Sequence, residues 1–221
     1  PELGRLEWGV LRRSGRLARV SNRSIRVETT IAADLETVWH LTQDPVRHAR
    51  WDARFSRIVP TKQGADGLWR FRYERRMLAH TIRGTGISLG SREGADGART
   101  SALRFTTTDR LSPLRDGRGY WRYEPVDGGV QFITGYDYEP GWGGLLDTLV
   151  VRPIVAWMTA ASFARLRRWA ERDEPPERWP LWLMALPGGR DRPRASDCAW
   201  SIGRPRAMAD APASLASLDA P

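Results

Sequence analysis

Alternating apolar and polar residues predict a series of short strands. In the first, residues 25–31, Ile25, Val27 and Ile31 alternate with charged residues and threonine, which is typical of a half-buried strand. The same alternation predicts further strands at residues 55–61, 68–76, 80–89, 101–107, 118–126 and 130–138. Short turns rich in Gly and Asp, such as Asp127–Gly129, separate several of these strands. We therefore expect an antiparallel meander of seven strands.

Helical spacing occurs in three places. Asp34 is a typical N-cap for a short helix over residues 35–43, and the Asp44-Pro45 step ends that helix because the residue before a proline disfavours helical geometry. A second short helix is expected at residues 46–51. A long helix of about 40 Å is predicted over residues 145–172, where the prolines of the following segment stop it.

The most apolar long stretch, residues 150–169, reads VVRPIVAWMTAASFARLRRW and lies within the long helix. It has three interpretations: a membrane span, a helix buried in a soluble core, or one wall of a ligand pocket. A membrane span needs about 20 nearly uncharged residues. Taken back to residue 145, this stretch carries Asp147 and Arg152, and three arginines close it. We therefore expect a core helix that also forms a pocket wall, with Trp157 toward the sheet and Thr159 on the opposite face.

The order of elements is one strand, two short helices, six strands and one long helix. A seven-stranded antiparallel sheet has one apolar face that must be buried. The simplest way to bury it is to wrap the sheet around the single long helix. The sequence therefore predicts an α+β domain over residues 24–172 in which the sheet surrounds the C-terminal helix. If the two short helices close one end, a cavity remains between sheet and helix.

Aromatic residues on the inner face of the predicted sheet are candidates for lining such a cavity. A stripe of aromatic residues at strand spacing also suits an ordinary packed core, so that alternative stays open. The phenols and Thr134 favour a pocket, because a ligand site needs a few placed polar groups among apolar ones. The predicted pocket residues are Trp69, Phe71, Tyr73, Phe105, Trp121, Tyr123, Phe132, Thr134, Tyr136, Trp157 and Ala161.

Two long segments resemble a known superfamily. Residues 27–55 read VETTIAADLETVWHLTQDPVRHARWDARF, and residues 135–171 read GYDYEPGWGGLLDTLVVRPIVAWMTAASFARLRRWAE. The order of elements, the Ala-Asp helix cap, the Val-Trp helix and the Asp-Pro and Trp-Asp steps resemble the START-like superfamily, also called SRPBCC, which has the helix-grip fold. That superfamily includes polyketide cyclases and dehydrases, lipid-transfer domains and coenzyme-Q-binding proteins. The resemblance implies the fold and says little about which ligand is bound.

The resemblance and the apolar sheet face predict binding or carriage of a hydrophobic small molecule, such as a lipid, a quinone or a polyketide-like compound. The alternative is an enzyme similar to polyketide cyclases and dehydrases that uses neither a metal nor a nucleotide cofactor. For such an enzyme the resemblance implies polar groups that orient an oxygen-rich chain, and Arg75 and Tyr136 are the catalytic candidates. Asp137 is expected to face outward, which counts against a built-in general base. Whether the protein is an enzyme stays open.

Composition and charge fit a globular chain with a basic extension. The chain has 221 residues, of which 41% are hydrophobic and 28% charged, and its formal net charge is +9. Residues 1–23 hold six arginines against two glutamates and form a predicted basic N-terminal extension. The central arginines mostly alternate with apolar residues on strands, which indicates a solvated outer face, so no nucleic-acid partner is expected. Contact between the extension and a membrane surface remains an alternative.

The C-terminal part departs from the pattern of the domain. Residues 173–187 form a segment rich in Pro and Trp after the long helix. Residues 188–221 have the Gly-, Pro-, Ala- and Arg-rich composition of a disordered tail.

No cofactor or metal site is predicted. His40, Asp44 and His48 have helical spacing, but Pro45 interrupts the helix and no further ligand group lies nearby in the sequence. No Gly-rich phosphate loop precedes a helix. The single Cys198 excludes an internal disulfide, and no apolar leader-like run follows the N-terminal arginines, so a cytoplasmic location is expected. The identity of the ligand and the oligomeric state stay open.

Overall fold

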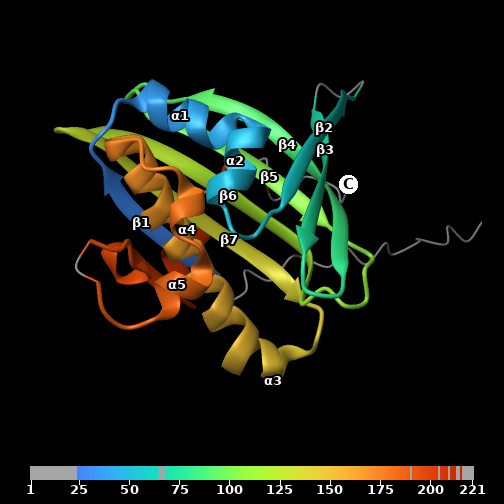
Figure 1. The fold of residues 1–221 in the computed structure, drawn as a ribbon. Helices are drawn as coiled ribbons and strands as arrows, with labels where there is room; N and C mark the ends of the chain where they lie inside the picture. The colour runs from blue at the N-terminus through green and yellow to red at the C-terminus, as the bar shows by residue number, and fades with distance from the viewer. Residues whose placement is uncertain are drawn as a thin grey trace, which may run out of the picture.

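A curved antiparallel sheet wraps around a long helix in the computed structural model (Figure 1). The structure describes residues 24–64, 68–189, 191–203, 205–208, 210–212 and 215. The extension predicted at residues 1–23 lies outside the described residues, and so does the alternative of its contact with a membrane surface. The α+β helix-grip fold predicted from the sequence is confirmed.

Within the described residues, eight strands form the sheet, one more than the sequence predicts. Their order is β2-β3-β4-β5-β6-β7-β1-β8, and each neighbouring pair is antiparallel. The strands are β1 (Ile25–Ile31), β2 (Arg57–Gln63), β3 (Trp69–Arg76), β4 (Thr81–Glu93), β5 (Arg99–Thr106), β6 (Leu114–Val126), β7 (Gly129–Pro140) and β8 (Ala199–Ile202).

The additional strand β8 comes from the tail that was expected to be disordered. It pairs with β1, with Trp200 opposite Val27 and Ile202 opposite Ile25. The expectation of disorder from residue 188 onward is therefore wrong for this segment. Composition misses it because the strand obtains its hydrogen bonds from the edge of β1, which lies far earlier in the sequence.

Helices cover the inner face of the sheet and both of its ends (Figure 1). The short helices after β1 lie at one end, and the long helix crosses the inner face. The helical elements are α1 (Leu35–Gln43), α2 (Pro45–Trp51), α3 (Gly144–Leu146), η1 (Asp147–Val151), α4 (Arg152–Arg172), η2 (Pro176–Arg178), α5 (Leu181–Ala185), η3 (Ala195–Asp197) and η4 (Pro205–Met208).

The predicted long helix consists of two parts joined by a wider turn. The turn, η1, is π-helical, and the regular helix α4 begins directly after it at Arg152. Pro153 stands in the first turn of α4. Proline is tolerated there because its missing N–H is not needed in the first turn of a helix.

One face of α4 packs closely on the sheet. Ala156, Ala160 and Ala164 are buried, and their small side chains let β1 approach the helix. Thr159 is also fully buried, so the expectation that it faces away from the sheet is wrong. Its hydroxyl donates to the carbonyl of Val155 at 2.8 Å, and the side chain therefore enters the core without an unsatisfied donor.

Aromatic rings fill the space between α4 and the middle of the sheet. Phe163 of α4 stacks on Phe132 of β7 with 4.5 Å between the ring centroids. Trp51, fully buried at the end of α2, meets both rings edge-on at 6.0 and 6.3 Å. Its indole N–H donates to the carbonyl of Leu41 at 3.0 Å. These contacts fix α1, α2 and α4 to one another and to the sheet.

A buried ion pair fixes the start of α4. Arg152 Nε lies 2.8 Å from Asp147 Oδ2, and each side chain is 2% exposed. Tyr138 donates its hydroxyl to the other oxygen of Asp147 at 2.7 Å, and the Arg152 guanidinium lies 4.1 Å from the centre of the Tyr138 ring. By length and composition Gly144–Arg172 could cross a membrane, yet 67% of its apolar window is buried inside the fold. The burial and the ion pair fit the predicted core helix.

Replacing Phe163 by alanine is expected to lower the free energy of unfolding by about 3–5 kcal/mol, because the change empties space beside Phe132 and Trp51. Leu149→Ala is the control. Leu149 is 67% exposed, so its loss should change stability by less than about 0.5 kcal/mol. Denaturant unfolding measures both values, and similar losses in the two variants would contradict the assignment of Phe163 to the core.

Candidate ligand-binding site

A cavity of about 1040 Å³ lies between the inner face of the sheet and the first part of the long helix. Strands β3 to β7 form one wall, and η1 with the start of α4 forms the other. Small-molecule sites commonly have volumes of about 300–1,000 Å³, so this cavity is large enough for a lipid-sized ligand. Its apolar lining includes Phe55, Ile82, Leu103, Leu114, Val151, Val155 and Met158.

Two aromatic rings of the cavity wall lie over glycines of the neighbouring strand. Tyr73 is paired with Gly84, and Phe105 is paired with Gly117. A Cβ atom on either glycine would overlap the ring of its partner. Glycine therefore lets these rings lie against the sheet, so that they take up less of the space in front of it.

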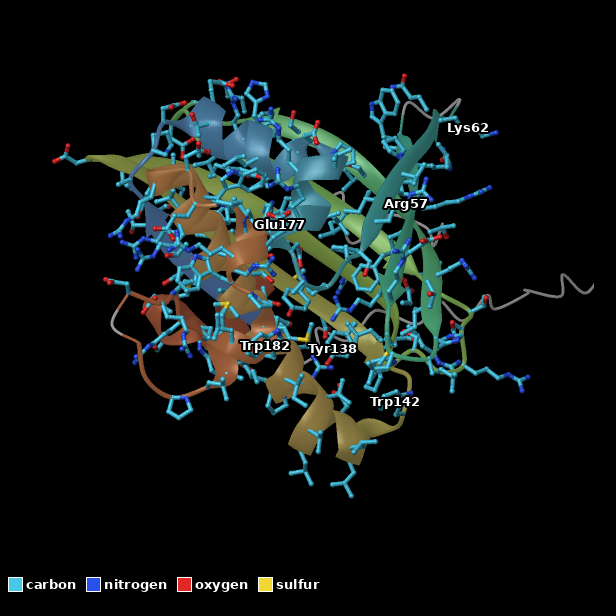
Figure 2. All side chains as sticks on the ribbon, viewed as in Figure 1. Arg57, Lys62, Tyr138, Trp142, Glu177 and Trp182 are labelled. Carbon is cyan, nitrogen blue, oxygen red and sulfur yellow. The ribbon has the colours of Figure 1, made fainter. Side chains whose placement is uncertain are left out.

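Exposed apolar side chains surround the mouth of the cavity. Leu78 in the β3–β4 turn, Leu111 in the β5–β6 loop and Trp142 after β7 all line the cavity and are exposed. Ile154 of α4 adds a side chain that is 50% exposed. Figure 2 shows Trp142 at the end of the molecule where β7 leads into α3. The mouth thus presents apolar surface to an arriving ligand.

An ion pair between Asp52 and Arg54 lies beside the cavity. Arg54, which lines the cavity, donates from Nη2 to Asp52 Oδ2 at 2.7 Å and from Nε to Oδ1 at 2.9 Å. Burial by itself would raise the pKa of Asp52, but the charge and hydrogen bonds of Arg54 and the hydrogen bond from His48 together outweigh burial and hold that pKa well below its usual range. Asp52 is therefore an ionised partner of Arg54 and is unsuited to act as a general base at neutral pH.

His48 joins this ion pair as a neutral ring. Its Nε2 lies 3.0 Å from Asp52 Oδ2. The ring stacks on Trp51 and meets Trp121 edge-on. Burial lowers the pKa of His48, although Asp52 acts in the opposite direction. A neutral His48 donates Nε2–H to the carboxylate of Asp52.

The hydroxyls predicted to serve a ligand are bonded within the fold. Tyr136 Oη lies 2.7 Å from Thr159 Oγ1, and Thr134 Oγ1 donates to the carbonyl of Tyr120 at 2.9 Å. Burial raises the pKa of Tyr136, although Arg54 acts against it. The phenol is therefore protonated at neutral pH and is suited to donate a hydrogen bond rather than to remove a proton.

Arg75 and His80 add polar groups to the cavity wall. Arg75 of β3 is half-buried and has no hydrogen bond or ion pair with any residue that the structure describes. His80, at the mouth, has its Nε2 2.7 Å from Asp109 Oδ2. The hydrogen bond from His80 lowers the pKa of Asp109, so this carboxylate is ionised and orients the imidazole.

Comparison with known proteins agrees with this geometry. Residues 22–171 match the family described as polyketide cyclase / dehydrase and lipid transport. The chain belongs to this family. YndG of Bacillus subtilis (strain 168), described as an uncharacterized membrane protein, is 36% identical over 162 residues, which are 71% of this chain and 60% of YndG. The chain thus spans 60% of the length of that relative.

Solved structures share the fold of the family. The di-domain ARO/CYC protein StfQ from the steffimycin biosynthetic pathway gives a TM-score of 0.51 at 11% identity, over 69% of this chain and 52% of StfQ. The Zhui aromatase/cyclase from Streptomyces sp. R1128 gives a TM-score of 0.48 at 18% identity, over 69% of this chain and 98% of Zhui. At such identities the likeness concerns the fold alone.

The cavity brings together about half of the site residues predicted from the sequence. Those that line it are Tyr73, Arg75, Phe105, Trp121, Thr134 and Tyr136.

The other predicted pocket residues lie outside the cavity lining. Tyr123, Phe132 and Ala161 are fully buried in the packed core, and Trp157 packs against that core partly buried. Trp69 is 52% exposed, and Phe71 lies near it on β3. Alternation along a strand identifies the face on which a side chain lies. It does not tell whether packed helices or an open space stand opposite that face.

Sequence reasoning missed Arg54, His80 and the leucines at the mouth. Arg54 belongs to a loop without periodicity, and the partner of His80 lies 29 residues further along the chain. A signal existed only for Leu78 and Leu111, since large apolar residues in polar loops often mark a contact site.

The histidines give no sign of a metal centre. In the part of the chain that the structure describes, no group of three His, Cys, Asp or Glu side chains is placed to hold a metal ion. His48 is engaged with Asp52, and His40 is exposed on α1. The absence of a metal or other cofactor stays a prediction.

Acidification is expected to destabilise the protein through His48. The pKa of His48 in the fold lies below its ordinary value of 6.5, so the unfolded chain binds more protons between the two values. The free energy of unfolding therefore falls as the pH falls through this window. His48→Gln, which can still donate to Asp52, should flatten the dependence of Tm on pH between about pH 7.5 and 5.5.

His40→Gln, a change of an exposed histidine, is the matched control and should keep the pH dependence of the unaltered protein. Thermal unfolding at a series of pH values measures both variants. An unchanged pH dependence in His48→Gln would show that His48 is not the group responsible.

Proposed function

We propose that this member of the family binds a hydrophobic small molecule, such as a lipid, a quinone or a polyketide-like compound, and carries it in the cavity. The observation that supports the proposal is a cavity of about 1040 Å³ whose lining is mostly apolar and whose mouth is open. Interiors of folded proteins are otherwise close-packed, so a space of this size suits a ligand. Burial contributes about 25 cal/mol per Å² of apolar surface, which makes it the main source of affinity.

The mouth supports exchange of such a ligand with apolar surroundings. Leu78, Leu111 and Trp142 are exposed there, and each also lines the cavity. An apolar ligand that arrives from a membrane or another protein meets these side chains before it enters. A cytoplasmic location and the absence of a nucleic-acid partner stay predictions.

Narrowing the cavity from the sheet side tests the proposal. Gly117→Ala places a Cβ where the ring of Phe105 lies, so the ring must move into the cavity. The affinity for apolar ligands should fall by about tenfold, since each 1.4 kcal/mol corresponds to a factor of ten. Gly86→Ala is the matched control, because it displaces Phe71, which does not line the cavity.

Native mass spectrometry of the full chain, incubated with a lipid extract and with quinones, measures uptake by the two glycine variants and the unaltered protein. Uptake by the unaltered protein and by Gly86→Ala, with reduced uptake by Gly117→Ala, is the expected result. No uptake of any apolar compound by the unaltered protein would overturn the proposed function.

The second candidate function is a metal-free cyclase or dehydrase acting on a polyketide-like substrate. The observation that favours it is the pair of His80 and Asp109 at the cavity, since an imidazole oriented by a carboxylate is suited to move a proton. The charge of Arg75 would then polarise a carbonyl, whereas the hydroxyl of Tyr136 is already bonded to Thr159.

His80→Gln should reduce turnover of a poly-β-ketone substrate by at least about 100-fold if His80 is the general base. Arg75→Ala should reduce it as well, through loss of the charge that polarises the carbonyl. His40→Gln is the control and should leave turnover unchanged, since His40 is exposed on α1. Product formation followed by liquid chromatography measures turnover. Equal rates in all three variants and the unaltered protein would exclude these groups as catalysts.

A further inference from the structure

Arg75 is a half-buried cation in the wall of an otherwise mostly apolar cavity. It lies on β3 two residues after Tyr73 and therefore on the same face of the strand. The side chain of Tyr73 contacts Phe55 and Phe105, which both line the cavity. Arg75 thus extends from the sheet into the space that the proposed ligand would occupy.

Asp52, the carboxylate whose charge acts on Arg75, has no hydrogen-bonding capacity left for it. Asp52 Oδ2 accepts from Arg54 Nη2 at 2.7 Å and from His48 Nε2 at 3.0 Å. Asp52 Oδ1 accepts from the backbone N–H of Arg54 at 3.0 Å and from its Nε at 2.9 Å. The hydrogen-bonding positions of the carboxylate are therefore filled by other groups.

A third guanidinium adds to the positive charge of this region. Arg165 of α4 is buried and donates to the carbonyls of Pro176 and Arg50 at 3.1 and 2.8 Å. Burial lowers the pKa of Arg165 and the charge of Arg75 acts in the same direction, whereas the charges of Asp52 and Glu177 act against them. Asp52 is paired with Arg54 and Glu177 with Arg50, while His48 is neutral. This end of the cavity has an excess of positive charge.

We propose that the ligand is an anionic amphiphile whose carboxylate, or another oxyanion, pairs with Arg75 while its apolar part fills the rest of the cavity. The inference rests on the proposed function and names the chemical class of its ligand. A half-buried charge without a partner is costly. A planar guanidinium can bind both oxygens of a carboxylate. The apolar part meets Ile82, Leu103 and Met158 on facing walls of the cavity.

A series of ligands with one alkyl chain and different head groups tests the charge preference. Isothermal titration of the full chain compares dodecanoate, dodecyl phosphate, 1-dodecanol and dodecyltrimethylammonium. At least one of the two anions should bind about ten- to a hundredfold more tightly than the alcohol, as expected for a charge-assisted hydrogen bond. The cation should bind least. The two anions distinguish a carboxylate from a phosphate as the natural head group.

Arg75→Met should lower the affinity for the anion to that for the alcohol and leave the affinity for the alcohol unchanged. Arg72→Met, a change of an exposed arginine of β3 that does not line the cavity, is the matched control and should keep the preference. The Tm of ligand-free Arg75→Met should not fall, because the change removes a half-buried cation that forms no hydrogen bond or ion pair with the described residues. A structural role for Arg75 would instead lower that Tm.

The outcomes separate the inference from the function on which it rests. Equal binding of dodecanoate, dodecyl phosphate and dodecanol, or uptake of only neutral or cationic compounds from a lipid extract, overturns the inference and leaves the proposed function in place. A preference for anions that survives in Arg75→Met also overturns it. Failure of every apolar compound to bind overturns the proposed function itself.

Discussion

The close contact between α4 and β1 is the interaction on which the rest of the structure depends. Buried alanines at positions 156, 160 and 164 let helix and strand approach, and Phe163 fills the remaining space against Phe132. Over its first two turns α4 also borders the cavity, since Val155 and Met158 line it and Ile154 is half exposed. One helix therefore serves both as part of the core and, through other side chains, as a cavity wall.

Glycines in the sheet help to keep the cavity open. Tyr73 and Phe105 lie over Gly84 and Gly117 of the adjacent strands, where any Cβ would overlap the rings. Because these rings lie against the sheet, they leave open space between the sheet and the helix. The sequence gives no sign of this role, because the cross-strand partner of each glycine is not adjacent in the chain.

The buried arginines fall into two groups. Arg152 has Asp147 and the ring of Tyr138, and Arg54 has Asp52, so these charges are compensated within the fold. Arg75 has no such partner among the described residues. In the sequence it looks like any other inner-face residue, because it follows Tyr73 on β3 by two positions. The sequence could nominate Arg75 and Tyr136 as polar groups of the inner face. Only the tertiary structure shows that the hydroxyl of Tyr136 is hydrogen-bonded within the fold, whereas the guanidinium of Arg75 forms no hydrogen bond or ion pair with the described residues.

The sequence by itself determined the strands of the domain, the two capped helices, the long apolar helix and hence the helix-grip fold, because hydrophobic periodicity and capping are local properties of the chain. It also selected residues such as Tyr73, Phe105, Trp121 and Tyr136 for the inner face. Only the tertiary structure decided which inner-face residues border open space, that β8 joins the edge of β1, and that Thr159 faces the core. Each of these depends on partners that lie far apart in the sequence or on hydrogen bonds that satisfy a polar group inside the core, which no local pattern encodes.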